Sequence, residues 1–406
     1  MAGRRAAALG VLALLAAGCG SSAKTNAPRT WTGPPGVVRI GVAHLLWPLD
    51  PARARGRDEI ALARTLFATP LRTAPTTGAL RPGLCSTWSS PDGSRTWRLR
   101  CRHAAAIARA LRRARLIPGA TIAAGAGALE ITAPRPDPEL PYALTEVAAA
   151  PAGVPGPFRL VSASPQKVVA ERGGVRLVFR KLDPHAAQRL FRQGRLDEAP
   201  VPLGDLQADL RNRALAPAVR VRRLLAVDLV EATRGGVLAR LPGLRRVYGA
   251  TADRADYQAL VPEFEAPPAF HLERPPSEKK VARAPVVATR AAKRMIGARP
   301  RAAVRFAEPS DPDLAYGAGL LIAAWQDLGL GPFVGRGRPD ARFERVLAPY
   351  PRLAALGAAV RGRQVIPIAW AVDARLVSPR LRGWREDDLG VVDYARVRPL
   401  ARTRSR

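Results

Sequence analysis

Side chains that could do chemistry are few and scattered along this chain of 406 residues. No histidine pairs at helical spacing with another histidine or a carboxylate, as a metal site needs; the four are His44, His103, His185 and His271. The acids of Arg385-Glu386-Asp387-Asp388 stand among abundant arginine, so we expect a solvated, charge-paired turn there. The chain has no Gly-x-Ser-x-Gly motif. We therefore predict that it is not an enzyme, and we expect no metal or cofactor.

The glycines of residues 329–339 (GLGPFVGRGRP) invite a phosphate-loop interpretation. They lack the Lys-Ser/Thr pair of a P-loop and the strand–glycine–helix order of a dinucleotide site. The segment is expected to be a flexible surface loop.

The formal charge of +32 raises the question of a polyanionic partner. Only six of the 65 basic residues are lysine, and arginine is spread along the whole length with alanine, proline and glycine. This pattern favours compositional bias over a nucleic-acid surface, which concentrates charge with interleaved aromatic residues. An exported polycation that binds anionic wall polymer, lipid or DNA stays open, and its affinity would fall steeply with salt.

The N-terminus is typical of an export signal. Arg4 and Arg5 precede an apolar run over residues 6–18, which is too short to span a bilayer. Ala17 and Gly18 before Cys19 resemble a bacterial lipobox, in which the cysteine is lipidated. We predict a lipoprotein signal peptide at 1–19, a flexible tether at 20–36 and an anchor on the outer face of the cytoplasmic membrane. The alternative is an ordinary signal peptide with an incidental cysteine.

Cys85 and Cys101 flank a predicted hairpin with a Pro91-Asp92-Gly93 turn. Export permits a disulfide, and closing a loop of this size stabilises a protein by roughly 3 kcal/mol. The two cysteines face each other directly if the loop spans residues 91–95. A tight turn at 91–93 would instead place Cys85 opposite Leu99. The alternative is two half-buried thiols.

Strand and helix patterns alternate along the chain. Runs of β-branched residues predict strands at 36–43, 120–124, 128–132, 158–182, 222–232 and 362–378. Helical patterns predict a helix capped by Asp58, a second one capped by Asp183 that runs to about Gly194, helices at 104–115 and 241–261, and a strand, loop and helix over 302–330. This order indicates an α/β fold without a repeat of fixed period.

Six segments, in order, resemble family 5 extracellular solute-binding proteins of ABC importers, the peptide- and nickel-binding type. They are 49–52 (LDPA), 80–100 (LRPGLCSTWSSPDGSRTWRLR), 156–172 (GPFRLVSASPQKVVAER), 191–202 (FRQGRLDEAPVP), 241–261 and 365–383. The resemblance implies a periplasmic-binding-protein-like (type II) fold, with two lobes around a hinged cleft. It places lobe I at 37–225 with 364–398 returning to it, lobe II at 226–363, a tail at 399–406, and crossings near 222–232 and 362–372.

The chain also departs from that family. It is shorter than typical members, mostly between His103 and Gly156, where an extra subdomain usually lies. The family's acidic segment corresponds to Leu347–Pro351, which has no acid, so a peptide amine would lose its counter-charge. The asparagine usual near the hinge is missing from residues 225–232.

For ligand contact the resemblance favours Trp47, Tyr248, Trp370 and Asp373, although aromatic residues of this kind are as often packing residues. The implied function is that of a monomeric, lipid-anchored receptor. It would capture a small molecule or peptide and deliver it to an ABC permease, with no nucleic-acid partner. The alternative is a degenerate paralogue that serves as an envelope scaffold or sensor.

Overall fold

A computed structural model describes residues 33–74, 77–254, 257, 302–309 and 312–400. The predicted signal peptide, Cys19, most of the tether and the last six residues of the tail lie outside these ranges. Within them, no helix has both the length and the apolar character that crossing a membrane requires.

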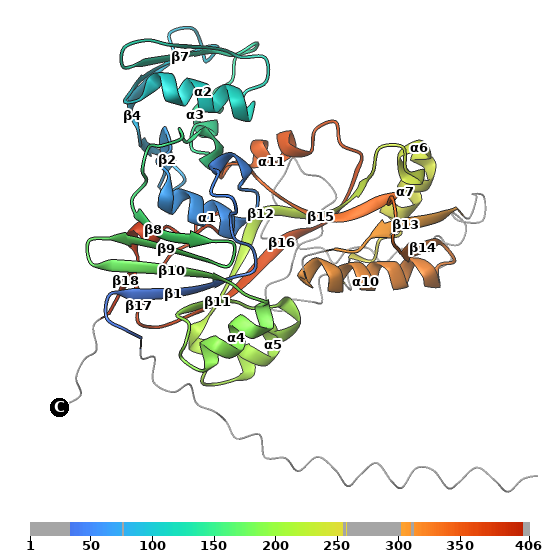
Figure 1. The fold of residues 1–406 in the computed structure, drawn as a ribbon. Coiled ribbons are helices and arrows are strands. Elements are labelled where there is room, and N and C mark those ends of the chain that lie inside the picture. The colour runs from blue at the N-terminus through green and yellow to red at the C-terminus, as the bar shows by residue number, and fades with distance from the viewer. Residues whose placement is uncertain (1–32, 75–76, 255–256, 258–301, 310–311, 401–406) are drawn as a thin grey trace, which may run out of the picture.

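A ten-stranded mixed sheet is the centre of the molecule (Figure 1). Its strands, in spatial order, are β14 (Gly331–Val334), β13 (Ala303–Ala307), β15 (Ala341–Leu347), β12 (Val219–Ala232), β16 (Val365–Val377), β11 (Glu198–Pro200), β1 (Val37–Val42), β10 (Val175–Lys181), β9 (Lys167–Arg172) and β8 (Arg159–Ser164). We call the side with β11, β1, β10, β9 and β8 lobe I and the side with β13, β14 and β15 lobe II. The segment 329–339 thus contains the edge strand β14, where a surface loop was expected, because its apolar residues pair with β13.

Two long antiparallel strands connect the lobes. The last part of β16 pairs with β11 on one side and with the first half of β12 on the other, whereas the second half of β12 pairs with β15. The pairing between β12 and β16 is irregular between Arg223 and Val227, midway along both strands. The predicted crossings at 222–232 and 362–372 fall on these two strands.

Helices cover the sheet and bury their apolar faces in two hydrophobic clusters. One cluster includes side chains of α4 (Pro184–Arg192), α5 (Leu203–Arg211), α6 (Val237–Arg240), α7 (Pro242–Ala250) and α10 (Pro312–Asp327). The other includes those of α1 (Arg57–Leu66) and α11 (Leu353–Val360). Asp183 caps α4 as predicted, because its carboxylate accepts the backbone N–H of Ala186.

A separate four-stranded sheet forms a small subdomain, at the top of Figure 1. Its strands, in order, are β4 (Cys85–Ser89), β5 (Thr96–Cys101), β7 (Ala128–Thr132) and β6 (Thr121–Ala124). With α2 (Ala104–Ala114) and α3 (Leu140–Ala143) they enclose a hydrophobic cluster of their own. The hairpin therefore belongs to this sheet. The residues that follow His103 supply the other two strands and both helices of the subdomain.

Short elements link these layers. They are η1 (Pro51–Arg53), η2 (Val147–Ala149), η3 (Ala216–Ala218), η4 (Tyr394–Arg396), the pair β2 (Leu71–Thr73) and β3 (Leu80–Pro82), and the pair β17 (Leu381–Arg382) and β18 (Arg398–Pro399).

Cys85 and Cys101 form a disulfide in the structure. Neither of the two uninterrupted registers considered for the hairpin occurs, since Ser89 lies opposite Arg98. A register shift between Cys85 and Thr87 adds one residue to β4 and brings the two cysteines face to face.

Candidate ligand-binding cleft

A cavity of about 420 Å³ lies between the lobes, which we call the cleft cavity. Lobe I contributes Ala43, His44, Arg55, Gly56, Arg57, Asp58, Glu59, Pro184, Pro200, Val201 and Pro202, and lobe II contributes Pro309, Leu314, Phe343, Glu344, Arg345 and Leu347. Leu224, on the crossing strand β12, also lines it. Because both lobes supply walls, a solute held here would contact both at once, and most of the surface it met would be apolar.

The start of α1 forms one wall, and its capping differs from the prediction. Gly56 precedes the helix, and the Glu59 carboxylate accepts the backbone N–H groups of Gly56 (3.1 Å) and Arg55 (2.8 Å). Asp58 is therefore not the cap. Its side chain is buried and bonded to Arg375, an ion pair that a local pattern cannot reveal.

On the lobe II wall, Arg345 is held by a buried carboxylate. Its Nε and Nη2 atoms donate to the two oxygens of Asp228, at 2.7 and 2.9 Å, from the position directly opposite on the neighbouring strand. The Tyr257 hydroxyl also donates to Asp228, at 2.8 Å. Beside them, Glu344 accepts from Arg363 at 2.5 Å. The charges of this wall are thus satisfied within the protein.

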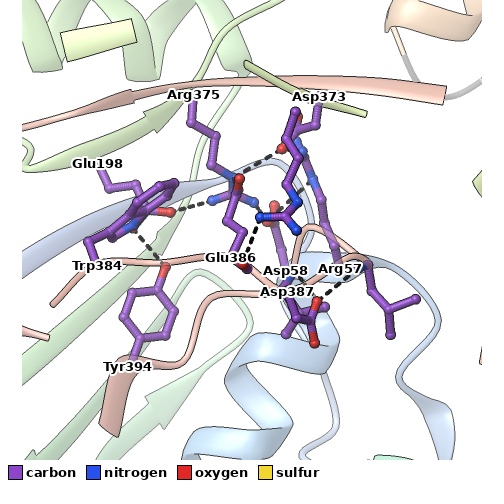
Figure 2. Close-up of polar contacts among 12 residues, drawn as sticks. Arg57, Asp58, Glu198, Asp373, Arg375, Trp384, Glu386, Asp387 and Tyr394 are labelled. Atoms are coloured by element: carbon purple, nitrogen blue, oxygen red, sulfur yellow. Dashed lines mark hydrogen bonds and ion pairs between the residues drawn. The ribbon is translucent and has the colours of Figure 1, made fainter. Parts of the chain in front are cut away.

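Below the cleft, a buried cluster of charged residues joins α1, β11, β16 and the C-terminal segment (Figure 2). Arg375 is its centre, with a side chain only 3% exposed. It donates to Asp58 and Glu198 and lies 3.4 Å from carboxylate oxygens of both Asp373 and Glu386. A buried guanidinium needs such partners, because leaving it unpaired would cost several kcal/mol.

The cluster extends to both sides of Arg375. Arg57, at the cavity wall, forms an ion pair with Asp373. On the other side, one oxygen of Glu198 accepts from the Tyr394 hydroxyl at 2.9 Å and from Trp384 Nε1 at 2.8 Å. These contacts tie the crossing strand β16 to lobe I and to the cavity wall.

Burial and charge act in opposite directions on the acids of this cluster. Burial alone would raise the pKa of Asp58, but the neighbouring Arg375 and Arg57 outweigh it and hold that pKa below its ordinary value. For Glu386 burial prevails, and it raises the pKa to about 7 against the pull of Arg375 and Arg57. Glu386 therefore titrates near neutral pH.

The acidic turn at 385–388 is consequently not the solvated turn that we expected. Glu386 is 7% exposed and Asp387 6% exposed. Asp387 accepts from Arg64 (2.5 Å) and from the backbone N–H groups of Leu389 (2.9 Å) and Val391 (3.1 Å), and only Asp388 conforms to the prediction. In the described part of the chain, no group of three or more histidine, cysteine, aspartate or glutamate side chains could hold a metal ion.

None of the four predicted ligand contacts lines the cleft cavity. Trp47 is 45% exposed, away from that lining. Tyr248 is fully buried, with its ring 4.8 Å from that of Trp325, so packing explains it. Trp370 is also buried, in the core cluster that includes α1. Asp373 lies beneath the cavity and reaches it through Arg57. Ligand contact by these four residues stays a prediction.

The two crossing strands and the cavity between two α/β lobes define the type II fold of periplasmic binding proteins. No protein-family model and no curated protein sequence matches the chain. Among solved structures it is similar to Haemophilus influenzae OppA in complex with the peptide RPPGFSPFR, with a TM-score of 0.76 at 14% identity, covering 91% of this chain and 100% of that one. It is also similar to the Escherichia coli murein tripeptide binding protein MppA, with a TM-score of 0.72 at 15% identity, covering 92% of this chain and 100% of that one. At these identities the likeness shows the fold.

A second structure of MppA gives a lower score. Its unliganded open form has a TM-score of 0.60, at 15% identity and covering 92% of this chain and 99% of that one.

Proposed function

We propose that this chain is the solute-binding component of an ABC importer and that it captures its ligand in the cleft cavity. The observation that carries the proposal is the cavity of about 420 Å³ with walls from both lobes and the strand β12 behind it. This volume lies within the roughly 300–1,000 Å³ of small-molecule sites. A ligand that contacts both lobes favours the closed state by the free energy of those contacts, so closure would report occupancy to a permease.

The lining also suggests what kind of solute binds. The arginines of the cavity walls include Arg345 and Arg57, which are already paired with Asp228 and Asp373. Among the described residues, Arg55 donates to the backbone carbonyls of Ala52 and Ala54, and its exposed guanidinium could meet a carboxylate of the ligand. We therefore propose a short peptide or similar organic solute with apolar groups and few formal charges. A free amine would have no dedicated counter-charge.

The remaining parts of the proposal come from the sequence and the comparisons. The residues around Cys19 favour export and a lipid anchor, and MppA is a periplasmic protein. An anchored receptor would stay close to a permease in the same membrane. Replacing Cys19 with alanine should release the protein from the membrane fraction, and unchanged fractionation would contradict the anchor.

A ligand screen tests the transport function directly. The purified protein is heated with a panel of di- to tetrapeptides, metal chelates and sugars, and its melting temperature is recorded. Binding to the native state raises that temperature, because only the folded protein holds the ligand. We expect at least one member to do so. A flat response throughout, with no co-purifying small molecule in native mass spectrometry, would contradict transport and favour the scaffold or sensor alternative.

A further inference from the structure

A second cavity, of about 600 Å³, lies where β2, β3, the end of β9 and the C-terminal segment meet. Its lining includes the arginines Arg64, Arg72, Arg81, Arg172 and Arg396 and the aspartates Asp387 and Asp393. We call it the arginine cavity. It shares no lining residue with the cleft cavity.

The two aspartates are already engaged by two of the arginines. Asp387 forms an ion pair with Arg64 at 2.5 Å, and Asp393 forms one with Arg396 at 3.1 Å. The remaining three arginines make no ion pair with any carboxylate among the described residues; they are Arg72, Arg81 and Arg172. Even Glu171, next to Arg172 in sequence, pairs with Arg159 and Arg176 instead.

The strand register brings two of these three arginines together at the cavity. Arg72 on β2 lies directly opposite Arg81 on β3, so the two side chains share one face of the two-stranded sheet. Like charges in this position destabilise a strand pair. Both side chains are exposed and line the cavity, and Arg172 lines it from β9. Three guanidinium groups from three strands thus surround a space that contains no free acid from the described chain.

From this geometry we propose that the arginine cavity binds a phosphate group, in a site separate from the transport cleft. Guanidinium groups bind phosphate through paired N–H donors, and a doubly charged oxyanion between Arg72 and Arg81 would turn their repulsion into attraction. The phosphate belongs either to a soluble phosphate ester or to the headgroup of an anionic lipid. Both have the same chemistry at the arginines.

Isothermal titration with pyrophosphate, at constant ionic strength, tests the site on the purified protein. We expect saturable binding that weakens at least about tenfold in Arg72→Gln/Arg81→Gln, because two charge-assisted contacts are lost. The control is Arg102→Gln/Arg109→Gln, which changes the net charge equally at two exposed arginines outside the cavity and should bind like the wild type. The melting temperature of Arg72→Gln/Arg81→Gln without ligand should be equal to or higher than that of the wild type, since the repulsion is gone.

Co-sedimentation with vesicles of phosphatidylglycerol and phosphatidylcholine distinguishes the two sources. Pyrophosphate binding without vesicle binding identifies a soluble ester, whereas vesicle binding that Arg72→Gln/Arg81→Gln abolishes and the control retains identifies a lipid headgroup. If the double variant fails to fold, Arg172→Gln on β9 gives the same test from the other wall. No binding of either probe, or equal losses in variant and control, would overturn the proposal. The panel used for the cleft contains no phosphate, so failure here leaves the transport function standing.

Discussion

The cleft cavity and the arginine cavity differ in how the arginines of their walls are paired. In the cleft, Arg345 is held by Asp228 and Arg57 by Asp373, so the walls form without help from a ligand. In the arginine cavity, Arg72 faces Arg81, and neither forms an ion pair with a carboxylate of the described residues, since the two aspartates of the lining pair with other arginines. The difference supports the two proposals, that the cleft selects its solute by shape and apolar contact and that the arginine cavity binds an anion.

The largest expected difference is in the unfolding free energy, when an arginine of each region is replaced with methionine. Arg375→Met would leave Asp58, Glu198 and Asp373 buried without their shared cation, at an expected cost of about 3–5 kcal/mol in unfolding free energy. Arg172→Met removes an exposed arginine that has no ion pair within the described part of the chain, and it should change stability by less than about 0.5 kcal/mol. Urea denaturation followed by circular dichroism measures both values. Similar values for the two variants would contradict the distinction between a compensated and an uncompensated site.

Removal of the disulfide in the subdomain should affect the arginine cavity but not the cleft cavity. Replacing Cys85 and Cys101 with serine frees a closed loop in the unfolded chain and should destabilise the subdomain by roughly 3 kcal/mol. Cys85 donates its backbone N–H to Pro70 next to β2, so the wall that carries Arg72 should loosen with it. Titration of the variant with pyrophosphate should show weaker binding, whereas its response to the cleft panel should persist. Loss of both responses would show that the subdomain also supports the cleft.

The buried acid below the cleft should make stability depend on pH. The pKa of Glu386 is raised by burial to about 7 in the folded protein, above its ordinary value of 4.5, so the folded state holds this proton more tightly. Stability from this group is therefore greatest at low pH and falls as pH rises from about 4.5 to about 7. Arg375, Arg57, Arg222 and Glu198 surround the carboxyl group and set the size of the effect.

Glu386→Gln mimics the protonated form and should flatten this dependence. Between pH 5 and pH 8 the wild type should lose up to about 3 kcal/mol that the variant keeps. Asp388→Gln, in the same turn but exposed, is the control and should follow the wild type. Urea denaturation at several pH values supplies the comparison, and parallel curves for Glu386→Gln and the wild type would rule out titration of this group.

The sequence predicted the frame of the molecule better than its charged sites. The strands at 222–232 and 362–378 and the Asp183 cap depend on local patterns, and the structure confirms them. The bond from Arg375 to Asp58 joins residues 317 positions apart, and its bond to Glu198 joins residues 177 apart. In a chain with 65 basic residues, no local signal separates such an arginine from its neighbours. The opposition of Arg72 and Arg81 depends on the register of two strands of three residues, which no periodicity reveals.

The central claim is that the cleft cavity binds the transported solute. A side chain that fills this cavity tests the claim most directly. Gly56 lines it, and a Cβ atom added there would meet no other atom within 4 Å, so Gly56→Trp places a bulky ring at the wall without backbone strain. Gly204→Trp is the matched control, because Gly204 has the same open surroundings outside the cavity. The test is a thermal-shift measurement with the peptide, chelate and sugar panel. The ligand that raises the melting temperature of the wild type should also raise that of Gly204→Trp. The same ligand should not change the melting temperature of Gly56→Trp. Equal shifts in all three proteins would contradict the account.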